Sequence, residues 1–295
     1  MANSSPYRLS PHPTYGFLQI EPTPSLAEIN EFYKSEFYSS NQNFNDSGLD
    51  VQLKDKEWYD LCRQRVFDNM TELFGEDMLG KALLDIGCGW GEALSFFQEK
   101  GMDCYGLDPV PEAVAYANRR GLKVIESQIE NVNIFSRQFH VVTLFNVLEH
   151  LADPVSVLEK IYKELLISGG LLIVDVPNEF NAFQLTGRDV HQLHDWWVAP
   201  PCHLNYFNTD TLCNLLTGIG YEIKLTESSF PIEIFLLFGE NYVGNSTLGR
   251  QCHEKRMNFE MSLCRFGRQD VLKMLYRSLA SLNLGRQVTA YAIKE

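Results

Sequence analysis

The chain has 295 residues, 45% of them hydrophobic, so it can bury the core of one large α/β domain or of two modest ones. Its 25 Lys and Arg against 38 Asp and Glu give a formal net charge of -13, which repels a phosphate backbone and disfavours a nucleic-acid substrate. The sequence shows neither a secretion signal nor an apolar run of about 18 residues, so we expect a cytoplasmic protein that makes no use of a membrane.

The first 79 residues are predicted to form a cap or lid. A Pro-rich lead is followed by an aromatic-rich segment (26–38) with helical spacing, a polar loop and a second helix (57–75). The aromatic side chains of the first helix either fold over a bound cofactor or form an ordinary packing stripe. We therefore assign 1–79 to an N-terminal cap.

Short apolar runs then alternate with amphipathic segments, which is the pattern of β-α-β units that build a parallel sheet. Helix signals separate the runs: Pro111 begins one predicted helix, Asp153 precedes another, and the pair Gly169-Gly170 is expected to end the latter. The five predicted strands span 81–87, 102–108, 122–127, 139–148 and 171–177.

After residue 178 the alternation breaks. The aperiodic segment 179–207 is expected to face the acceptor, and a helix (209–220), a sixth strand (221–228) and a final strand (286–295) complete the core. Apolar residues at helical spacing make 229–284 a helical insertion, which either buries a homodimer face or caps the acceptor pocket. The fold class is therefore a doubly wound, mostly parallel seven-stranded sheet, with the core formed by 80–228 and 285–295.

The most informative motif is LLDIGCGWGE, which places Asp85 and a glycine loop between the first predicted strand of the core and the first helix. Gly87, Gly89 and Gly91 permit a tight turn that brings a ligand close to bare backbone. Asp108 follows 23 residues after Asp85, at the tip of the next strand, where a carboxylate accepts both hydroxyls of a ribose. This combination predicts an adenosine ligand.

Two kinds of adenosine ligand fit such a loop. An NAD-type oxidoreductase uses the same architecture, but its loop reads GxGxxG and receives a pyrophosphate. Here the spacing is GxGxG, and Asp85 would repel a pyrophosphate while attracting a cationic amino-acid group. S-adenosylmethionine, a sulfonium amino acid, is therefore favoured as the cofactor.

LLDIGCGWGE, GLDPV and FNVLEHLADP resemble the class I methyltransferases, within them the small-molecule and sugar enzymes related to ubiquinone-biosynthesis methyltransferases, over about residues 80–225. The resemblance implies that Asp85 and the glycine loop hold the methionine part and Asp108 the ribose. It also implies adenine contacts after the third core strand and closure of the site after the fourth. The residues assigned to cofactor binding are Asp85, Gly87, Gly89, Gly91, Asp108, Gln128, Ile129 and Asn146.

The chain departs from this family at several positions. Gln128 stands where an Asp commonly binds the adenine amine, and its amide oxygen accepts that hydrogen bond more weakly. His140 replaces the usual Asp of the fourth strand. Metal-dependent relatives carry an acid where this chain has Asn146, and the seven cysteines never form a CxxC pair. We therefore predict no metal.

Methyl transfer to oxygen or carbon needs a base, and histidine serves near neutral pH. His150 follows the fourth core strand, while His203 and Tyr206 match a proline, histidine and YF pattern of the family beyond the fifth. We predict these three as catalytic, the alternatives being that His203 binds backbone and that His150 braces its loop. The predicted acceptor-binding residues are His194, Trp196 and Trp197, although adjacent tryptophans can also anchor a loop.

The sequence thus predicts an S-adenosylmethionine-dependent methyltransferase that acts on a small polar acceptor. A sugar, a sugar nucleotide or a natural-product hydroxyl is expected, with O-methylation slightly favoured over C-methylation. The alternatives are an NAD-type oxidoreductase and a catalytically silent member of the fold that only binds ligands or partners.

Overall fold

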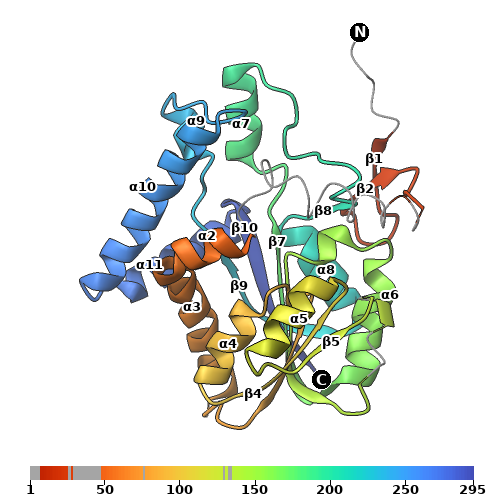
Figure 1. Ribbon diagram of the computed structural model, residues 1–295. Coiled ribbons are helices and arrows are strands. Elements are labelled where there is room, and N and C mark those ends of the chain that lie inside the picture. The colour runs from red at the N-terminus through yellow and green to blue at the C-terminus, as the bar shows by residue number, and fades with distance from the viewer. Residues whose placement is uncertain (1–6, 26–27, 29–47, 76, 129, 132–134) are drawn as a thin grey trace.

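The computed structural model describes every residue except 1–6, 26–27, 29–47, 76, 129 and 132–134 (Figure 1). A seven-stranded sheet in the order β5-β4-β3-β6-β7-β10-β9 runs through it. Strands β5 to β7 pair in parallel, whereas β10 is antiparallel to both neighbours, which confirms the predicted fold class. The strands are β3 (Ala82–Ile86), β4 (Asp103–Asp108), β5 (Val124–Glu126), β6 (Phe139–Phe145), β7 (Leu166–Pro177), β9 (Tyr221–Ser228) and β10 (Gln287–Lys294).

Two hydrophobic cores lie on opposite faces of this sheet, because successive strand residues point to opposite sides. Leu83 of β3 packs in one core, with α3 (Lys56–Phe74), α4 (Glu92–Glu99) and α5 (Pro111–Arg119). Leu84 packs in the other, with α6 (Pro154–Lys160) and α8 (Thr209–Ile219). The sheet is therefore the middle layer of a three-layer sandwich.

The expectation that Gly169-Gly170 ends the helix after Asp153 is wrong. That helix closes with a π-helical turn (Ile161–Leu165), and β7 begins at once, so both glycines lie inside the strand. Gly169 has a φ of 73°, and a Cβ on Gly170 would lie 2.9 Å from the carbonyl oxygen of Ile167. The glycines therefore form an irregularity of the strand rather than a helix end.

A second, three-stranded sheet was not predicted. It joins β1 (Arg8–Pro11), β2 (Leu18–Glu21) and β8 (Asn205–Tyr206), and it covers a small core that contains Trp197. The N-terminal hairpin thereby pairs with the segment that follows β7. Four-residue strands flanked by prolines give too short an alternation to be recognised in the sequence.

The helical insertion contains α9 (Ile234–Leu237), α10 (Ser246–Arg265) and α11 (Gln269–Ser281). It lies beside α2 (Leu49–Lys54) and α3 on one side of the molecule (Figure 1). The buried carboxylate of Glu260 on α10 accepts hydrogen bonds from Trp58 of α3 and Tyr276 of α11 and so ties the three helices together. The aromatic helix expected over 26–38 lies almost entirely outside the described residues.

Among the helices that are described, none combines the length and apolar character needed to cross a membrane.

Candidate functional site

The glycine loop joins the end of β3 to the start of α4. Gly87, Gly89 and Gly91 all adopt left-handed backbone conformations, with φ of 72°, 52° and 79°. A Cβ on Gly91 would lie 2.6 Å from Leu122, whereas one on Gly89 would meet no atom within 4 Å. Gly91 therefore permits helix packing, and Gly89 leaves its backbone open to an approaching ligand.

Asp85 lies beneath this loop and is almost fully buried. The Thr143 hydroxyl donates a hydrogen bond to it at 2.6 Å. Burial, and to a lesser degree the nearby charge of Asp108, raise the pKa of Asp85 to about 7. A positively charged ligand group above the loop would favour the ionised carboxylate.

Asp108 ends β4, the strand next to β3, and is also buried. Its carboxylate accepts hydrogen bonds from the backbone N–H of Gly89 at 2.7 Å and of Val110 at 2.9 Å. Burial raises its pKa. Because each carboxylate oxygen has further lone-pair capacity, Asp108 can hold the glycine loop and still accept ligand hydroxyls.

The remaining cofactor candidates follow β5 and β6 at the same edge of the sheet. Gln128 is exposed just beyond β5, and its neighbour Ile129 lies outside the described residues. Asn146, directly after β6, has a φ of 55°, and its backbone N–H donates to the carbonyl oxygen of Asp175 at 2.9 Å. The Gln287 side chain donates to the Asn146 side-chain oxygen at 2.6 Å. The cofactor candidates that are described thus share one edge.

The structure brings His150 and His203 together. Their ring centroids lie 5.0 Å apart in an edge-on arrangement, and His150 Nδ1 lies 2.7 Å from the carbonyl oxygen of Cys202. Burial lowers the pKa of His150 to about 4 and that of His203 well below its ordinary value. Both imidazoles are therefore neutral near pH 7. Within the described part of the chain, the buried Nδ1 of His203 has no hydrogen-bond partner.

His150, Cys202 and His203 also form a group whose candidate metal-ligand atoms lie within 4.8 Å of one another. Zinc bonds of about 2.0–2.3 Å would need a closer approach and a thiolate. Burial instead raises the pKa of the Cys202 thiol to about 12. The absence of a metal stays a prediction.

Tyr206 and Trp197 have internal contacts. The Tyr206 hydroxyl donates to the carbonyl oxygen of His203 at 3.0 Å and accepts from the Ala199 N–H at 3.1 Å. Trp197 is buried and packs edge-on against Phe180, with ring centroids 5.3 Å apart. The contacts of these two side chains hold the loop that carries His203 in place. Trp196 packs beside Trp197 and is half-buried.

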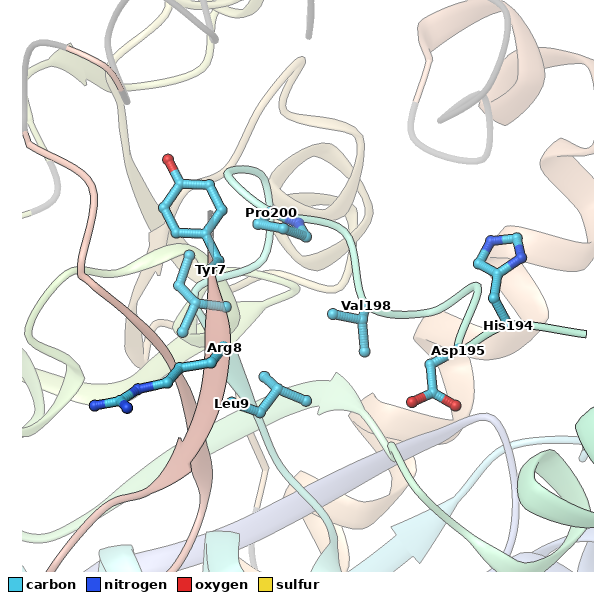
Figure 2. Close-up of a pocket in the computed structure, with 8 residues that line it drawn as sticks. Tyr7, Arg8, Leu9, His194, Asp195, Val198 and Pro200 are labelled. Carbon is cyan, nitrogen blue, oxygen red and sulfur yellow. The ribbon is translucent and has the colours of Figure 1, made fainter. Parts of the chain in front are cut away.

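His194 lies apart from the other candidates. It lines a hollow of about 270 Å³ between the N-terminal hairpin and the segment that follows β7. Figure 2 shows His194 and Asp195 on one side of this hollow and β1 on the other. The lining residues are Tyr7, Arg8, Leu9, Ile20, His194, Asp195, Val198 and Pro200.

A further cluster of ionisable side chains, Glu179, Glu233 and Arg286, lies at the same edge of the sheet and is not marked by any sequence motif. Arg286 Nη1 lies 3.8 Å from Glu179 Oε1 and 3.6 Å from Glu233 Oε1. Both carboxylates are almost fully buried. No sequence pattern marks the two acids, because Glu179 lies in the aperiodic segment 179–207 and Glu233 lies in the insertion.

Comparisons of the sequence with known proteins match it to methyltransferases. Residues 58–225 match the family model described as a methyltransferase domain. The ubiquinone biosynthesis O-methyltransferase of Ruegeria pomeroyi is 31% identical over 158 residues, which cover 48% of this chain and 60% of that protein. The enzyme of the same name from Histophilus somni is 28% identical over 116 residues, 36% of this chain and 49% of that protein. The chain thus spans about half the length of these curated relatives.

Two solved structures resemble this fold. A SAM-dependent methyltransferase from Archaeoglobus fulgidus has a TM-score of 0.50 and 17% identity, over 79% of this chain and 94% of that one. The plantazolicin methyltransferase BamL, whose structure is a complex with a triazolic desmethylPZN analog and SAH, has a TM-score of 0.53 and 14% identity, over 90% of this chain and 94% of its own. At these identities the likeness concerns the fold.

Proposed function

The chain belongs to the class I S-adenosylmethionine-dependent methyltransferases, and from that premise we propose that it methylates a small polar acceptor. The acceptor is a sugar, a sugar nucleotide or a natural-product hydroxyl, and O-methylation is favoured over C-methylation. The O-methyltransferase relatives support a hydroxyl acceptor.

The observation that carries this proposal is the contact between the Asp108 carboxylate and the Gly89 N–H. It joins the acid that would accept the ribose hydroxyls to the loop that would cradle the methionine part. Below the loop, Asp85 would balance the charge of the amino acid. The proposed cofactor-binding residues are Asp85, Gly87, Gly89, Gly91, Asp108, Gln128, Ile129 and Asn146.

S-adenosylmethionine supplies an electrophilic methyl group on a positively charged sulfur. The protein must then align the acceptor, exclude water and take up a proton. We assign the proton to His203, because its imidazole is neutral and its Nδ1 has no hydrogen-bond partner among the described residues. The acceptor hydroxyl would lose its proton to this nitrogen as its oxygen bonds to the methyl carbon, and the bond between that carbon and sulfur would break, with S-adenosylhomocysteine as the leaving group.

His150 and Tyr206 support this role. His150 packs edge-on against His203, and the Tyr206 hydroxyl holds the His203 carbonyl. Tyr206 is therefore a positioning residue in this proposal, while His150 shares the catalytic site. His194, Trp196 and Trp197 would bound the acceptor side, His194 from the hollow in Figure 2.

The same proposal assigns roles to the parts of the chain. Residues 1–79 cap the cofactor site, 80–228 with 285–295 form the core, and 229–284 form the insertion. The insertion either closes the acceptor side or buries a homodimer face, and sedimentation of the full chain distinguishes the two.

The direct test is methyl transfer from labelled S-adenosylmethionine to a panel of sugars and sugar nucleotides. With an accepted substrate, His203→Ala should lower kcat by roughly 10²–10⁴-fold, the usual contribution of a general base, and leave S-adenosylhomocysteine affinity unchanged. Full activity of the variant would remove His203 from the mechanism.

A further inference from the structure

We propose that Glu179, Glu233 and Arg286 form the acceptor-recognition site and bind vicinal hydroxyl groups of a neutral polyol. This inference rests on the proposed methyltransferase function and specifies the acceptor class. It concerns residues that the sequence motifs do not mark.

The topology brings these three residues to one place. Glu179 follows β7 by two residues, and Glu233 follows β9 by five. Arg286 precedes β10, and because β10 is antiparallel to both strands, its start lies beside their ends. The next residue, Gln287, contacts Asn146 of the cofactor site. The group therefore adjoins the proposed methyl donor.

Three of the four carboxylate oxygens in this group accept no hydrogen bond from the described residues. Glu179 Oε2 accepts a hydrogen bond from the Gln184 side chain at 2.6 Å, but Glu179 Oε1 accepts none. Neither oxygen of Glu233, a residue only 1% exposed, accepts a hydrogen bond from the described residues. The contacts of both acids with Arg286, at 3.8 and 3.6 Å, exceed hydrogen-bond length. No described residue donates a hydrogen bond to these three oxygens, and we assign their donors to a bound molecule.

Leaving buried carboxylate oxygens unpaired costs free energy, which a binding site can offset when its ligand arrives. Burial raises the pKa of Glu179 to about 7 and also raises the pKa of Glu233. The charge of Arg286 opposes both shifts. A neutral ligand that donates hydrogen bonds satisfies the carboxylates without a further buried charge.

Nearby groups decide the chemistry of the ligand. The Arg286 guanidinium, with Nη1 at 3.8 Å from Glu179 Oε1 and 3.6 Å from Glu233 Oε1, brings a hydrogen-bond donor group to the two acids. The site thus offers unpaired acceptors together with a donor. A hydroxyl both donates and accepts, whereas an ammonium group only donates and a phosphate would be repelled by two acids. Vicinal hydroxyls therefore fit best, as ribose hydroxyls fit Asp108.

The site is also close to the proposed base. Burial lowers the pKa of His203, and the positive charge of Arg286 lowers it further. Glu179 is joined to the same loop, because its backbone N–H donates to the carbonyl oxygen of Phe207 at 2.8 Å. In this proposal, a diol held by the two glutamates lies beside the segment that carries His203 and Phe207.

The test uses the full chain saturated with S-adenosylhomocysteine and saturation-transfer NMR. The probes are methyl hexopyranosides, their 2,3-dideoxy counterparts and a methyl 2-amino-hexopyranoside. We expect the diol probes to bind about tenfold or more tightly than the dideoxy probes, since buried polar groups would otherwise stay unpaired. Glu233→Gln and Glu179→Gln should abolish this preference. Glu222→Gln, an exposed acid on β9, should keep it.

Each result has a distinct meaning. Failure of the wild-type chain to bind S-adenosylhomocysteine would refute the proposed function itself. If that ligand binds, the inference is overturned by absent hexoside binding, by equal binding of diol and dideoxy probes, by unchanged preference in Glu233→Gln, or by preference for the amine. Unchanged S-adenosylhomocysteine affinity in each variant shows that the fold is intact.

Discussion

Gln287 donates a hydrogen bond to the side chain of Asn146 at 2.6 Å, across the intervening strand β7. The contact joins the first residue of β10 to the residue that follows β6. Asn146 holds a left-handed backbone conformation, with a φ of 55°. The contact therefore links the sheet edge that we propose for the cofactor to Gln287, the chain neighbour of Arg286 in the proposed acceptor site.

Two substitutions of Asn146 should separate the energetic cost of its left-handed backbone conformation from the contribution of its side-chain hydrogen bond. Asn146→Gly and Asn146→Ala both lose the contact with Gln287, but only alanine is strained at positive φ. We expect the alanine variant to be less stable than the glycine variant by about 1 kcal/mol. Urea unfolding of the pair measures the difference. An alanine variant as stable as the glycine variant would show that the left-handed conformation is absent.

Asp85 should make stability fall as pH rises. Its folded pKa of about 7 lies above its ordinary value of 3.8, so the folded state binds the proton more tightly and stability is lost between these values. Asp85→Asn removes this cost, and we expect it to raise the free energy of unfolding at pH 8 by ~1–3 kcal/mol and to weaken S-adenosylhomocysteine binding. Urea unfolding at pH 5 and pH 8 tests this. A variant less stable than wild type at pH 8 would contradict it.

His150 should contribute a pH dependence of stability with the opposite sign, because its stabilising contribution is lost as pH falls. Its folded pKa of about 4 lies below its ordinary value of 6.5, so the unfolded state takes up the proton and stability is lost as pH falls from 6.5 to about 4. In His150→Gln, the loss of unfolding free energy between pH 7 and pH 5 should shrink by ~1–2 kcal/mol. The exposed His194→Gln serves as control. An equal acid response in wild type and His150→Gln would refute the burial of a neutral imidazole.

Tyr206→Phe should destabilise the loop that carries His203. The hydroxyl makes two hydrogen bonds to backbone groups while nearly fully buried, so its removal should cost ~1–2 kcal/mol. Tyr116→Phe is the control, because Tyr116 is a half-buried tyrosine of α5 whose ring packs edge-on against Trp90 rather than on the His203 loop. As a positioning residue, Tyr206 should affect kcat more than KM. Equal stability of the two variants would remove this role.

Much of the fold could be predicted from local patterns. Five apolar runs separated by Pro111, Asp153 and glycine signals gave the parallel strands, since each signal acts within a few residues. Where a signal had two meanings, the prediction was wrong: Gly169-Gly170 suits a helix end and a strand irregularity equally. The β1-β2-β8 sheet depends on pairing across nearly 190 residues, which no local pattern carries.

The candidate site likewise has one part that a local motif predicts and another part that it does not. Asp85, the glycine loop and Asp108 form a motif of fixed spacing and could be predicted together. Glu179, Glu233 and Arg286 meet only because β10 returns antiparallel between β7 and β9. They come together only in the tertiary structure, so the proposed role of these three residues in acceptor recognition could not be predicted from spacing.

The central claim is that the edge formed by β3, β4 and β6 binds an S-adenosyl ligand. Calorimetric titration with S-adenosylhomocysteine, beside NAD, tests it most directly. We predict micromolar binding of S-adenosylhomocysteine alone, lost in Asp108→Ala and kept in Asp103→Ala, a less buried acid on the same strand. Binding of NAD alone, or S-adenosylhomocysteine binding that survives Asp108→Ala unchanged, would contradict the account.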